Sequence, residues 1–196
     1  MPVESTASSS PRRRLGAPAR IGLKVLLVVS IGFAAHAYWA FVQFRITTVE
    51  SDVAYHTSVI PPEKIGEFAK ERDIRTVIDL RHSSSATEAE QAACEAAGIR
   101  YVNIPSSQVP SQESVDAFLK VLDDPDSRPV LMHCYHGEGR APMFGAIYRM
   151  EYLGWKPEEA RKATRFFSFR GSFKPGSGKG EFVRSYVPRH AQITGD

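Results

Sequence analysis

The chain has 196 residues, enough for one domain and an appendage. Hydrophobic residues make up 42% and charged residues 24%, which excludes wholesale disorder. The net charge is +3, and the first 24 residues, with five basic residues and Glu4, carry +4 of it. The rest of the chain therefore has a net charge of 3 − 4 = −1. This argues against a nucleic-acid-binding domain and a nucleic-acid partner.

The N-terminal arm, residues 1–20, is rich in Ser, Pro, Ala and Arg and has no apolar period, so we expect a disordered basic arm. An apolar segment follows at residues 21–44, where Lys24, His36 and Gln43 are the only strongly polar side chains. As a helix, residues 25–44 would span about 30 Å, the thickness of the hydrocarbon core of a bilayer. The segment therefore predicts a transmembrane signal anchor.

The charges beside this segment predict its orientation. Five basic residues precede residue 25, whereas Arg45 is the one basic residue in the short stretch that follows the segment. The positive-inside rule then places the N-terminus in the cytoplasm and the remaining chain outside, in the periplasm if the source is a Gram-negative bacterium. A cleaved signal sequence is an alternative, because Ala35-His36-Ala37 fits the small-x-small cleavage pattern, and a buried helix is another. Apolar residues at 38–44, beyond that cleavage point, favour a retained anchor.

Strand-like and helix-like stretches alternate after the segment, which predicts an α/β domain at residues 46–190 and a tail at 191–196. We expect a small mixed β-sheet flanked by helices. The expected strands cover residues 53–56, 76–80, 100–104 and 130–133, and the expected helices cover 62–71, 86–97, 112–122, 141–152 and 157–164. Pro62 at a helix start, and Gly98 and Gly154 just past helix ends, agree with capping preferences. The composition of residues 173–180 predicts a flexible loop.

The most informative stretch is residues 130–140, which read Val-Leu-Met-His-Cys-Tyr-His-Gly-Glu-Gly-Arg. An apolar strand there leads into a loop and a helix N-terminus, where backbone N–H groups and the helix dipole favour an anion. Gly137 and Gly139 permit positive φ angles, and Arg140 can grip two phosphate oxygens with its planar fork. The same positive field favours the thiolate of Cys134. We expect a nucleophile facing a bound phosphate, rather than a cysteine that is only a small buried apolar residue.

This stretch resembles the His-Cys-x5-Arg motif of the cysteine-based protein tyrosine phosphatase superfamily, specifically its dual-specificity-like bacterial branch. Residues 52–62, 74–81 and 98–105 are also similar to the opening strands of small bacterial members. The resemblance covers roughly residues 53–186 and implies hydrolysis of phosphate monoesters through a phosphocysteine, without cofactor or metal. It implies Cys134 and Arg140 as catalytic residues and His133 as a residue that orients the loop. The expected phosphate-binding residues are those of the loop: Tyr135, His136, Gly137, Glu138, Gly139 and Arg140.

Two departures from the family pattern predict slow chemistry. The loop after Ile104 should carry an aspartate that protonates the leaving group, but residues 105–112 contain no carboxylate. The nearest candidates for a general acid are Glu138, Asp116 and Glu113. Ala141 stands where many members have a Ser or Thr hydroxyl that helps expel the thiolate. Weak acid catalysis should favour aryl phosphates, since a phenol with a pKa of about 10 leaves more readily than an alkyl alcohol.

Several alternatives stay open at this stage. The two departures also fit a pseudophosphatase that binds phosphorylated ligands without turnover, and a rhodanese-like sulfur transferase shares the strand, cysteine loop and helix. Expected partners are phosphorylated proteins, small molecules or lipids, and the membrane. Arg165, Arg170 or Lys174 could rim the phosphate pocket or meet anionic lipid headgroups. Cys94 is expected in the core, although a disulfide with Cys134 is conceivable outside the cytoplasm.

Overall fold

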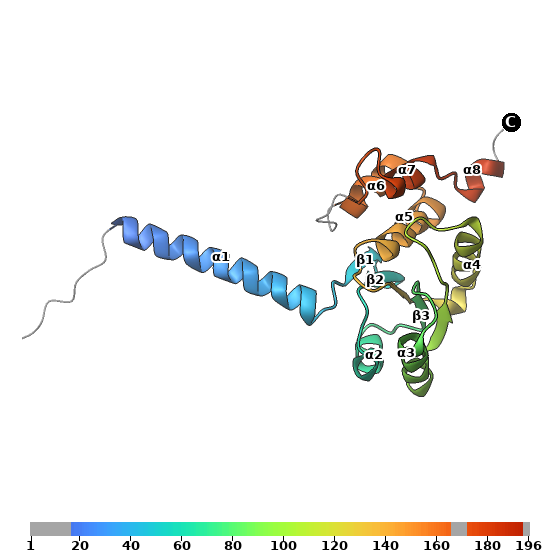
Figure 1. Cartoon of the computed structure of the whole chain (residues 1–196), viewed down its shortest axis with the longest axis horizontal. Helices are drawn as coiled ribbons and strands as arrows, with labels where there is room; N and C mark the ends of the chain where they lie inside the picture. The colour runs from blue at the N-terminus through green and yellow to red at the C-terminus, as the bar shows by residue number, and fades with distance from the viewer. Residues whose placement is uncertain (1–16, 166–171, 194–196) are drawn as a thin grey trace, which may run out of the picture.

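A computed structural model describes residues 17–165 and 172–193. Its five-stranded sheet has the order β1-β2-β5-β3-β4, with helices on both faces (Figure 1). The strands are β1 (Thr47–Glu50), β2 (Ala54–Thr57), β3 (Thr76–Asp79), β4 (Arg100–Asn103) and β5 (Val130–His133). The helices are α1 (Ala17–Phe41), α2 (Pro62–Lys70), α3 (Ser85–Ala96), α4 (Gln112–Leu122), α5 (Arg140–Tyr152), α6 (Pro157–Arg165), α7 (Gly178–Ser185) and α8 (Arg189–Ile193), with a 3₁₀ turn at Pro125–Ser127. The predicted α/β class with a mixed sheet is confirmed.

The sheet pairs four strands in parallel and adds β1 antiparallel to β2. Successive residues of a strand face opposite sides of a sheet. On β5, Val130 and Met132 accordingly belong to the apolar cluster beneath α4 and α5, whereas Leu131 belongs to the cluster beneath α2 and α3. Two cores on two faces explain why β5 is a continuous apolar run rather than an alternating one.

The parallel strands bring three polar residues side by side at their carboxyl ends. His133 of β5 lies in register with Asp79 of β3 on one side and with Thr57 of β2 on the other. The chain leaves β5 at this edge and enters α5 through the loop that contains Cys134. Ligand sites in parallel sheets lie outside the carboxyl ends of the strands, so the topology directs attention to this edge.

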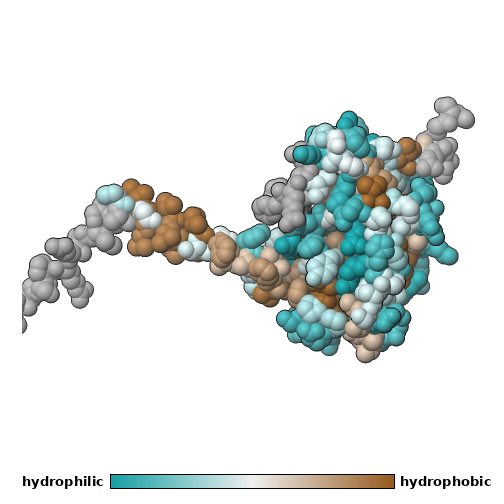
Figure 2. Space-filling view, viewed as in Figure 1, coloured by the Kyte–Doolittle hydropathy of each residue, from teal (hydrophilic) through white to brown (hydrophobic). Residues whose placement is uncertain are grey.

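Helix α1 extends away from the domain, and most of its exposed side chains are apolar (Figure 2). Residues 21–41 are the one stretch of the described chain that is long and apolar enough to cross a membrane, a property that signal sequences share. The helix ends at Phe41 rather than at residue 44 as expected. Phe44 instead packs edge-on against Phe68 of α2, with ring centroids 5.8 Å apart, and is buried in the domain.

The structure differs from the expected elements before β2 and after α6. Strand β1 was not expected, and helices α7 and α8 follow where no helix was predicted. The predicted loop at residues 173–180 is wrong in its last part, since α7 begins at Gly178. Ser177 caps that helix by accepting a hydrogen bond from the Gly180 N–H. The arm at residues 1–16 and the end of the tail, 194–196, lie outside the described residues, and residues 17–20 belong to α1.

Candidate active site

The loop between β5 and α5 is held tightly against the end of β2. Gly137 has a φ of +69°, and a Cβ on it would lie 2.7 Å from the backbone nitrogen of Ser58. The Val59 N–H also donates to the Tyr135 carbonyl at 3.2 Å. Only glycine fits this position, because both the backbone angle and the space exclude a side chain.

Cys134 and Arg140 line one cavity of about 290 Å³ in front of this loop. The other lining residues are Arg45, Gln108, His136, Glu138, Gly139, Ser172 and Lys179. Gly139 caps the N-terminus of the 13-residue helix α5, so the dipole of that helix points its positive end at the cavity. The cavity therefore combines a thiol, three cationic side chains and a helix N-terminus, which is the electrostatics of an anion site.

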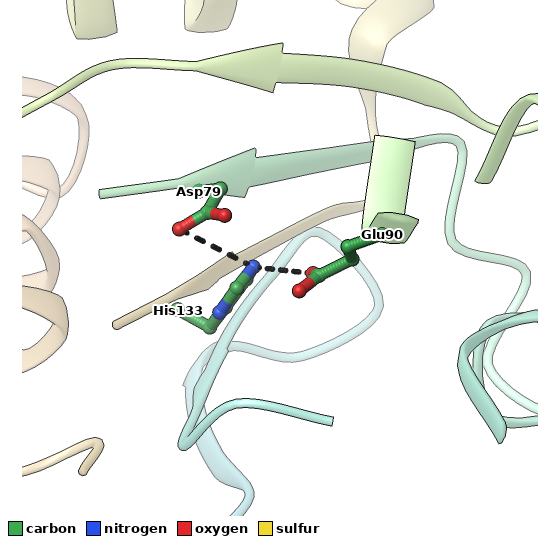
Figure 3. Close-up of side chains that lie close together, drawn as sticks. All are labelled: Asp79, Glu90 and His133. Carbon is green, nitrogen blue, oxygen red and sulfur yellow. Dashed lines mark ion pairs between the residues drawn. The ribbon is translucent and has the colours of Figure 1, made fainter. Parts of the chain in front are cut away.

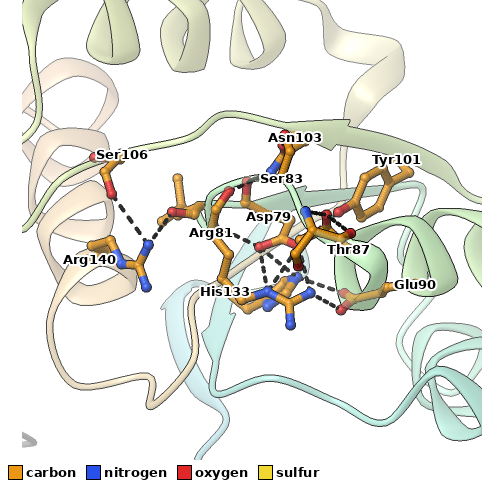
Figure 4. Close-up of polar contacts among 12 residues, drawn as sticks. Asp79, Arg81, Ser83, Thr87, Glu90, Tyr101, Asn103, Ser106, His133 and Arg140 are labelled. Atoms are coloured by element: carbon orange, nitrogen blue, oxygen red, sulfur yellow. Dashed lines mark hydrogen bonds and ion pairs between the residues drawn. The ribbon is translucent and has the colours of Figure 1, made fainter.

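The guanidinium of Arg140 is fixed by two backbone carbonyls (Figure 4). Its Nη1 donates to the Leu80 carbonyl at 2.7 Å and to the Ser106 carbonyl at 3.3 Å. Leu80 follows β3 and Ser106 follows β4, so two neighbouring strand ends orient the side chain. Among the described residues the other guanidinium nitrogens donate no hydrogen bond, which leaves donors for a ligand in the cavity.

Below the loop lies a buried charged network, which we define as Asp79, Arg81, Glu90, Tyr101 and His133 (Figures 3 and 4). Arg81 Nη2 donates to Asp79 Oδ2 at 2.7 Å and to Glu90 Oε2 at 2.5 Å, while the Tyr101 hydroxyl donates to Asp79 Oδ2 at 2.7 Å. Burial alone would raise the pKa of the Asp79 carboxyl, but hydrogen bonds from Arg81 and Tyr101 and the neighbouring His133 hold that pKa below its ordinary value.

His133 faces this network rather than the cavity. Its Nε2 lies 2.7 Å from Glu90 Oε1 and 3.8 Å from Asp79 Oδ1. In the part of the chain that the structure describes, its ring forms no hydrogen bond with the loop. Any orienting effect of His133 on the loop therefore passes through its backbone, which directly precedes Cys134.

Asp79, Glu90 and His133 each offer a ligand atom within 4.8 Å of the others, and are the one such group of three among the described residues. The sequence did not reveal this grouping, because its members lie far apart along the chain. The Arg81 guanidinium already binds both carboxylates, however, and supplies the positive charge that a metal ion would otherwise bring. The donor set is therefore that of a buried ion-pair network.

The three candidate acids occupy different surroundings. Glu138 lines the cavity, but its carboxylate is paired with Arg45, which also donates to the His136 carbonyl at 3.0 Å. Glu113 and Asp116 are exposed on α4 and are absent from the cavity lining. Asp116 accepts a hydrogen bond from Gln112 and lines a separate hollow with Arg189. Gln108 is the residue that the loop after β4 contributes to the cavity.

Two cationic residues of the cavity were missed by the sequence reasoning. Arg45 follows the apolar segment, where nothing in the sequence marks it as a site residue, and Lys179 lies in the stretch predicted to be a flexible loop. Ser177 as a helix cap was the one local signal that could have revealed α7 and, with it, Lys179. Lys174, which was considered for the rim, is exposed and does not line the cavity; Arg170 and the side chain of Arg165 lie outside the described residues.

The remaining predicted residues lie in the loop or in the core. Tyr135 is 59% exposed, and its ring meets that of His136 edge-on at 4.7 Å. Cys94 is fully buried on α3, as expected, and burial raises its thiol pKa to about 12. Cys94 and Cys134 are both free thiols, and they belong to the clusters on opposite faces of the sheet.

Comparison with known sequences gives the family of this chain. A family model described as a DSP-PTPase phosphatase fused to NAD+ kinase matches residues 35–179. The dual specificity protein phosphatase TpbA of Pseudomonas aeruginosa strain UCBPP-PA14 is 26% identical over 120 residues, and TpbA of strain PAO1 is 25% identical over 116 residues. These alignments cover 60% and 58% of this chain, and the chain spans about half the length of the curated relatives it matches.

Solved structures support the fold. The core catalytic domain of the PP-IP phosphatase SIW14 from S. cerevisiae superposes with a TM-score of 0.63 at 17% identity, over 76% of this chain and 88% of that chain. The crystal structure of P. aeruginosa TpbA superposes with a TM-score of 0.54 at 21% identity, over 73% and 86%. Because the family model matches well over half of the chain, this protein belongs to the dual-specificity-type protein tyrosine phosphatase family.

Proposed function

We propose that the protein is a cysteine-dependent phosphatase that hydrolyses phosphate monoesters through a phosphocysteine. The observation that carries the proposal is the shared cavity of Cys134 and Arg140 at the N-terminus of α5. The Cys134 thiolate attacks phosphorus, an S–P bond forms and the P–O ester bond breaks. Water then attacks phosphorus, the S–P bond breaks, and inorganic phosphate and the thiolate are released. Arg140 and the loop amides stabilise the equatorial oxygens in both steps.

An aryl phosphate such as phosphotyrosine is the proposed class of substrate, although small-molecule or lipid phosphates have the same reacting group. A TpbA crystal structure contains phosphotyrosine, with a TM-score of 0.53 and 19% identity to this chain. His136 lines the cavity, and its exposed ring contacts that of the exposed Tyr135 in the same loop, so the two rings offer apolar and polar surface to an aromatic leaving group. The negative charge of phosphate complements the cationic side chains that line the cavity.

Helix α1 is proposed as a single-pass anchor with the catalytic domain outside the cytoplasm. Its apolar side chains at residues 21–41 are exposed, and the basic residues lie before them in the chain. The mass of the mature protein distinguishes an anchor from a cleaved signal, and protease treatment of spheroplasts, in which the inner membrane is intact, reports the orientation. A full-length mass together with cleavage of the domain in spheroplasts is the expected pair of results. Loss of the first 37 residues would contradict the anchor.

Turnover of 4-nitrophenyl phosphate by the full-length protein in detergent tests the activity. We expect the wild type to release nitrophenol and the Cys134→Ser variant to release none. Arg140→Ala should lower kcat/KM on the order of 100-fold or more, since one lost donor to the developing charge costs that much. Arg184→Ala is the matched control, because Arg184 is half-exposed on α7 and pairs with Glu181 away from the cavity.

A pseudophosphatase is the second candidate, because the described cavity lining contains no carboxylate free of a cationic partner. The two functions separate in one experiment. If wild type and Cys134→Ser both bind phosphotyrosine in calorimetry and neither releases phosphate, the protein binds phosphorylated ligands without turnover. Release by the wild type alone supports the enzyme.

A further inference from the structure

Lys179 enters the cavity from α7, whereas the other lining residues come from loops and from the start of α5. A Cβ on Gly139 would lie 2.7 Å from its Nζ, so the ammonium group lies directly over the phosphate loop. The side chain is half-buried, and its Nζ stands 5.8 Å from the centroid of the buried Phe173 ring. Lys179 is therefore a positioned cation rather than a solvated surface lysine.

This ammonium forms no ion pair or hydrogen bond with any described residue. The charged groups that share its cavity are Arg45, Glu138 and Arg140, together with the titratable Cys134 and His136. Glu138 is taken by Arg45. On the same helix, Glu181 accepts from the Gly176 N–H and pairs with Arg184. A partly desolvated ammonium whose N–H groups lack a hydrogen-bond acceptor is unfavourable, so we expect a ligand in the cavity to accept those hydrogen bonds.

The position of Lys179 matches the gap in the catalytic machinery. The same Cβ on Gly139 would lie 3.0 Å from Gln108 Oε1, so Lys179 and Gln108 flank one side of the loop together. Gln108 belongs to the loop after β4, where the family resemblance implies a general acid, but an amide cannot donate a proton and recover it. The ammonium of Lys179 lies beside that loop and can do both.

We propose that Lys179 is the general acid and base of this phosphatase, an inference that rests on the proposed function. As the P–O bond breaks, one ammonium proton moves to the leaving oxygen, which departs as a neutral alcohol or phenol. The resulting amine then takes a proton from the water that attacks phosphorus while the S–P bond breaks. The thiolate and the ammonium are both restored, so the cycle needs no other proton donor.

The electrostatics of the cavity suit this role. Burial lowers the pKa of Lys179; the neighbouring Cys134 opposes this effect, and the charge of Arg140 reinforces it, with a net lowering from the ordinary value. A lowered pKa makes the Lys179 ammonium a stronger acid than the ammonium of a surface lysine. Its pKa is then closer to neutral pH, where a general acid is most effective.

Two leaving groups and two substitutions test the proposal in the full-length protein. Lys179→Met should lower kcat/KM for phenyl phosphate on the order of 100-fold, because this parameter reports formation of the phosphocysteine, in which acid catalysis of a poor leaving group is lost. The same variant should keep kcat/KM for 2,4-dinitrophenyl phosphate within a few-fold, since that phenolate leaves unprotonated. Lys179→Arg should not restore the hydrolysis of phenyl phosphate, because a guanidinium does not release its proton near neutral pH. Lys174→Met is the control, as Lys174 is exposed and outside the cavity lining.

A role in binding alone gives the opposite pattern and would overturn the proposal. In that case Lys179→Met raises KM equally for both esters, and Lys179→Arg restores it. Failure of the proposed function gives a third result. The wild type would then release dinitrophenol no faster than Cys134→Ser, and both proposals would be wrong. Vanadate binding by each variant, measured by calorimetry, shows that the loop still folds around an oxyanion.

Discussion

The two glycines of the phosphate loop meet different surroundings. At Gly137 the neighbours are backbone atoms of Thr57 and Ser58, which cannot move without disturbing β2. At Gly139 the neighbours are the ends of Lys179 and Gln108, which are flexible side chains. A methyl group at the first position therefore strains the fold, whereas at the second it displaces the ends of two side chains that line the cavity.

Gly137→Ala should destabilise the protein and abolish turnover. The φ of +69° costs an alanine roughly 1 kcal/mol or more, and the contact with the Ser58 nitrogen adds to that cost. Thermal unfolding and 4-nitrophenyl phosphate hydrolysis measure the two effects. Gly139→Ala is the matched variant, for which we expect near wild-type thermal stability with a lower kcat. Equal stability losses for both variants would contradict this distinction.

At the scale of elements, the site depends on strand ends that are held together by the buried network. Asp79 ends β3, His133 ends β5, Tyr101 lies on β4 and Glu90 on α3, so four elements meet at one set of charges. The loop that carries Cys134 starts directly above them. A network of this kind fixes the geometry only while every charge has its partner.

Asp79→Asn should be among the most damaging substitutions in the domain. It leaves the buried Arg81 with a single carboxylate, and removing one partner of a buried ion pair costs about 3 to 5 kcal/mol. Tyr101→Phe removes one hydrogen bond to the same carboxylate and should cost only about 1 to 3 kcal/mol. Urea unfolding of both variants tests the order. A smaller loss for Asp79→Asn than for Tyr101→Phe would contradict the network.

Elements that form from local signals were predicted correctly from the sequence. Strand β5 and helix α4 have the expected bounds, because an apolar run after a proline and a Ser111 cap each act within a few residues. Strand β1 escaped prediction since Thr47–Glu50 is short and is stabilised by pairing with β2, as in the register of Thr47 with His56. Helix α7 escaped because its glycines and lysines read as a loop, whereas the buried Val183 packs it onto the core.

The residues of the candidate site also fall into those that a local pattern reveals and those that only the tertiary fold brings together. The spacing of Cys134 and Arg140 is local to one loop, so the sequence revealed both. Arg45 pairs with Glu138 across 93 residues of chain, and Lys179 arrives on a helix that was not predicted. No local pattern marks either residue, because only the tertiary fold brings them to the loop.

For the whole molecule, pH dependence of stability follows from a histidine at the centre of the domain. His56 of β2 is buried beneath α5, and its Nδ1 has no hydrogen-bond partner among the described residues. Burial and the nearby charge of Arg149 lower the pKa of His56 to about 3 from its usual 6.5. The folded protein thus holds this ring neutral through the range in which the unfolded chain takes up a proton.

Acidification from pH 7 should therefore weaken the fold well before carboxylates titrate. Below pH 6.5 the unfolded state binds a proton that the folded state refuses, so stability falls as pH falls, until the folded pKa near 3 is reached. At pH 5 the loss from this one group is about 2 kcal/mol. Urea unfolding at pH 7 and pH 5 measures it, and His56→Leu should remove that part of the difference. His82→Leu, at an exposed position, should retain the wild-type difference, and an identical pH dependence in all three proteins would show that His56 does not carry it.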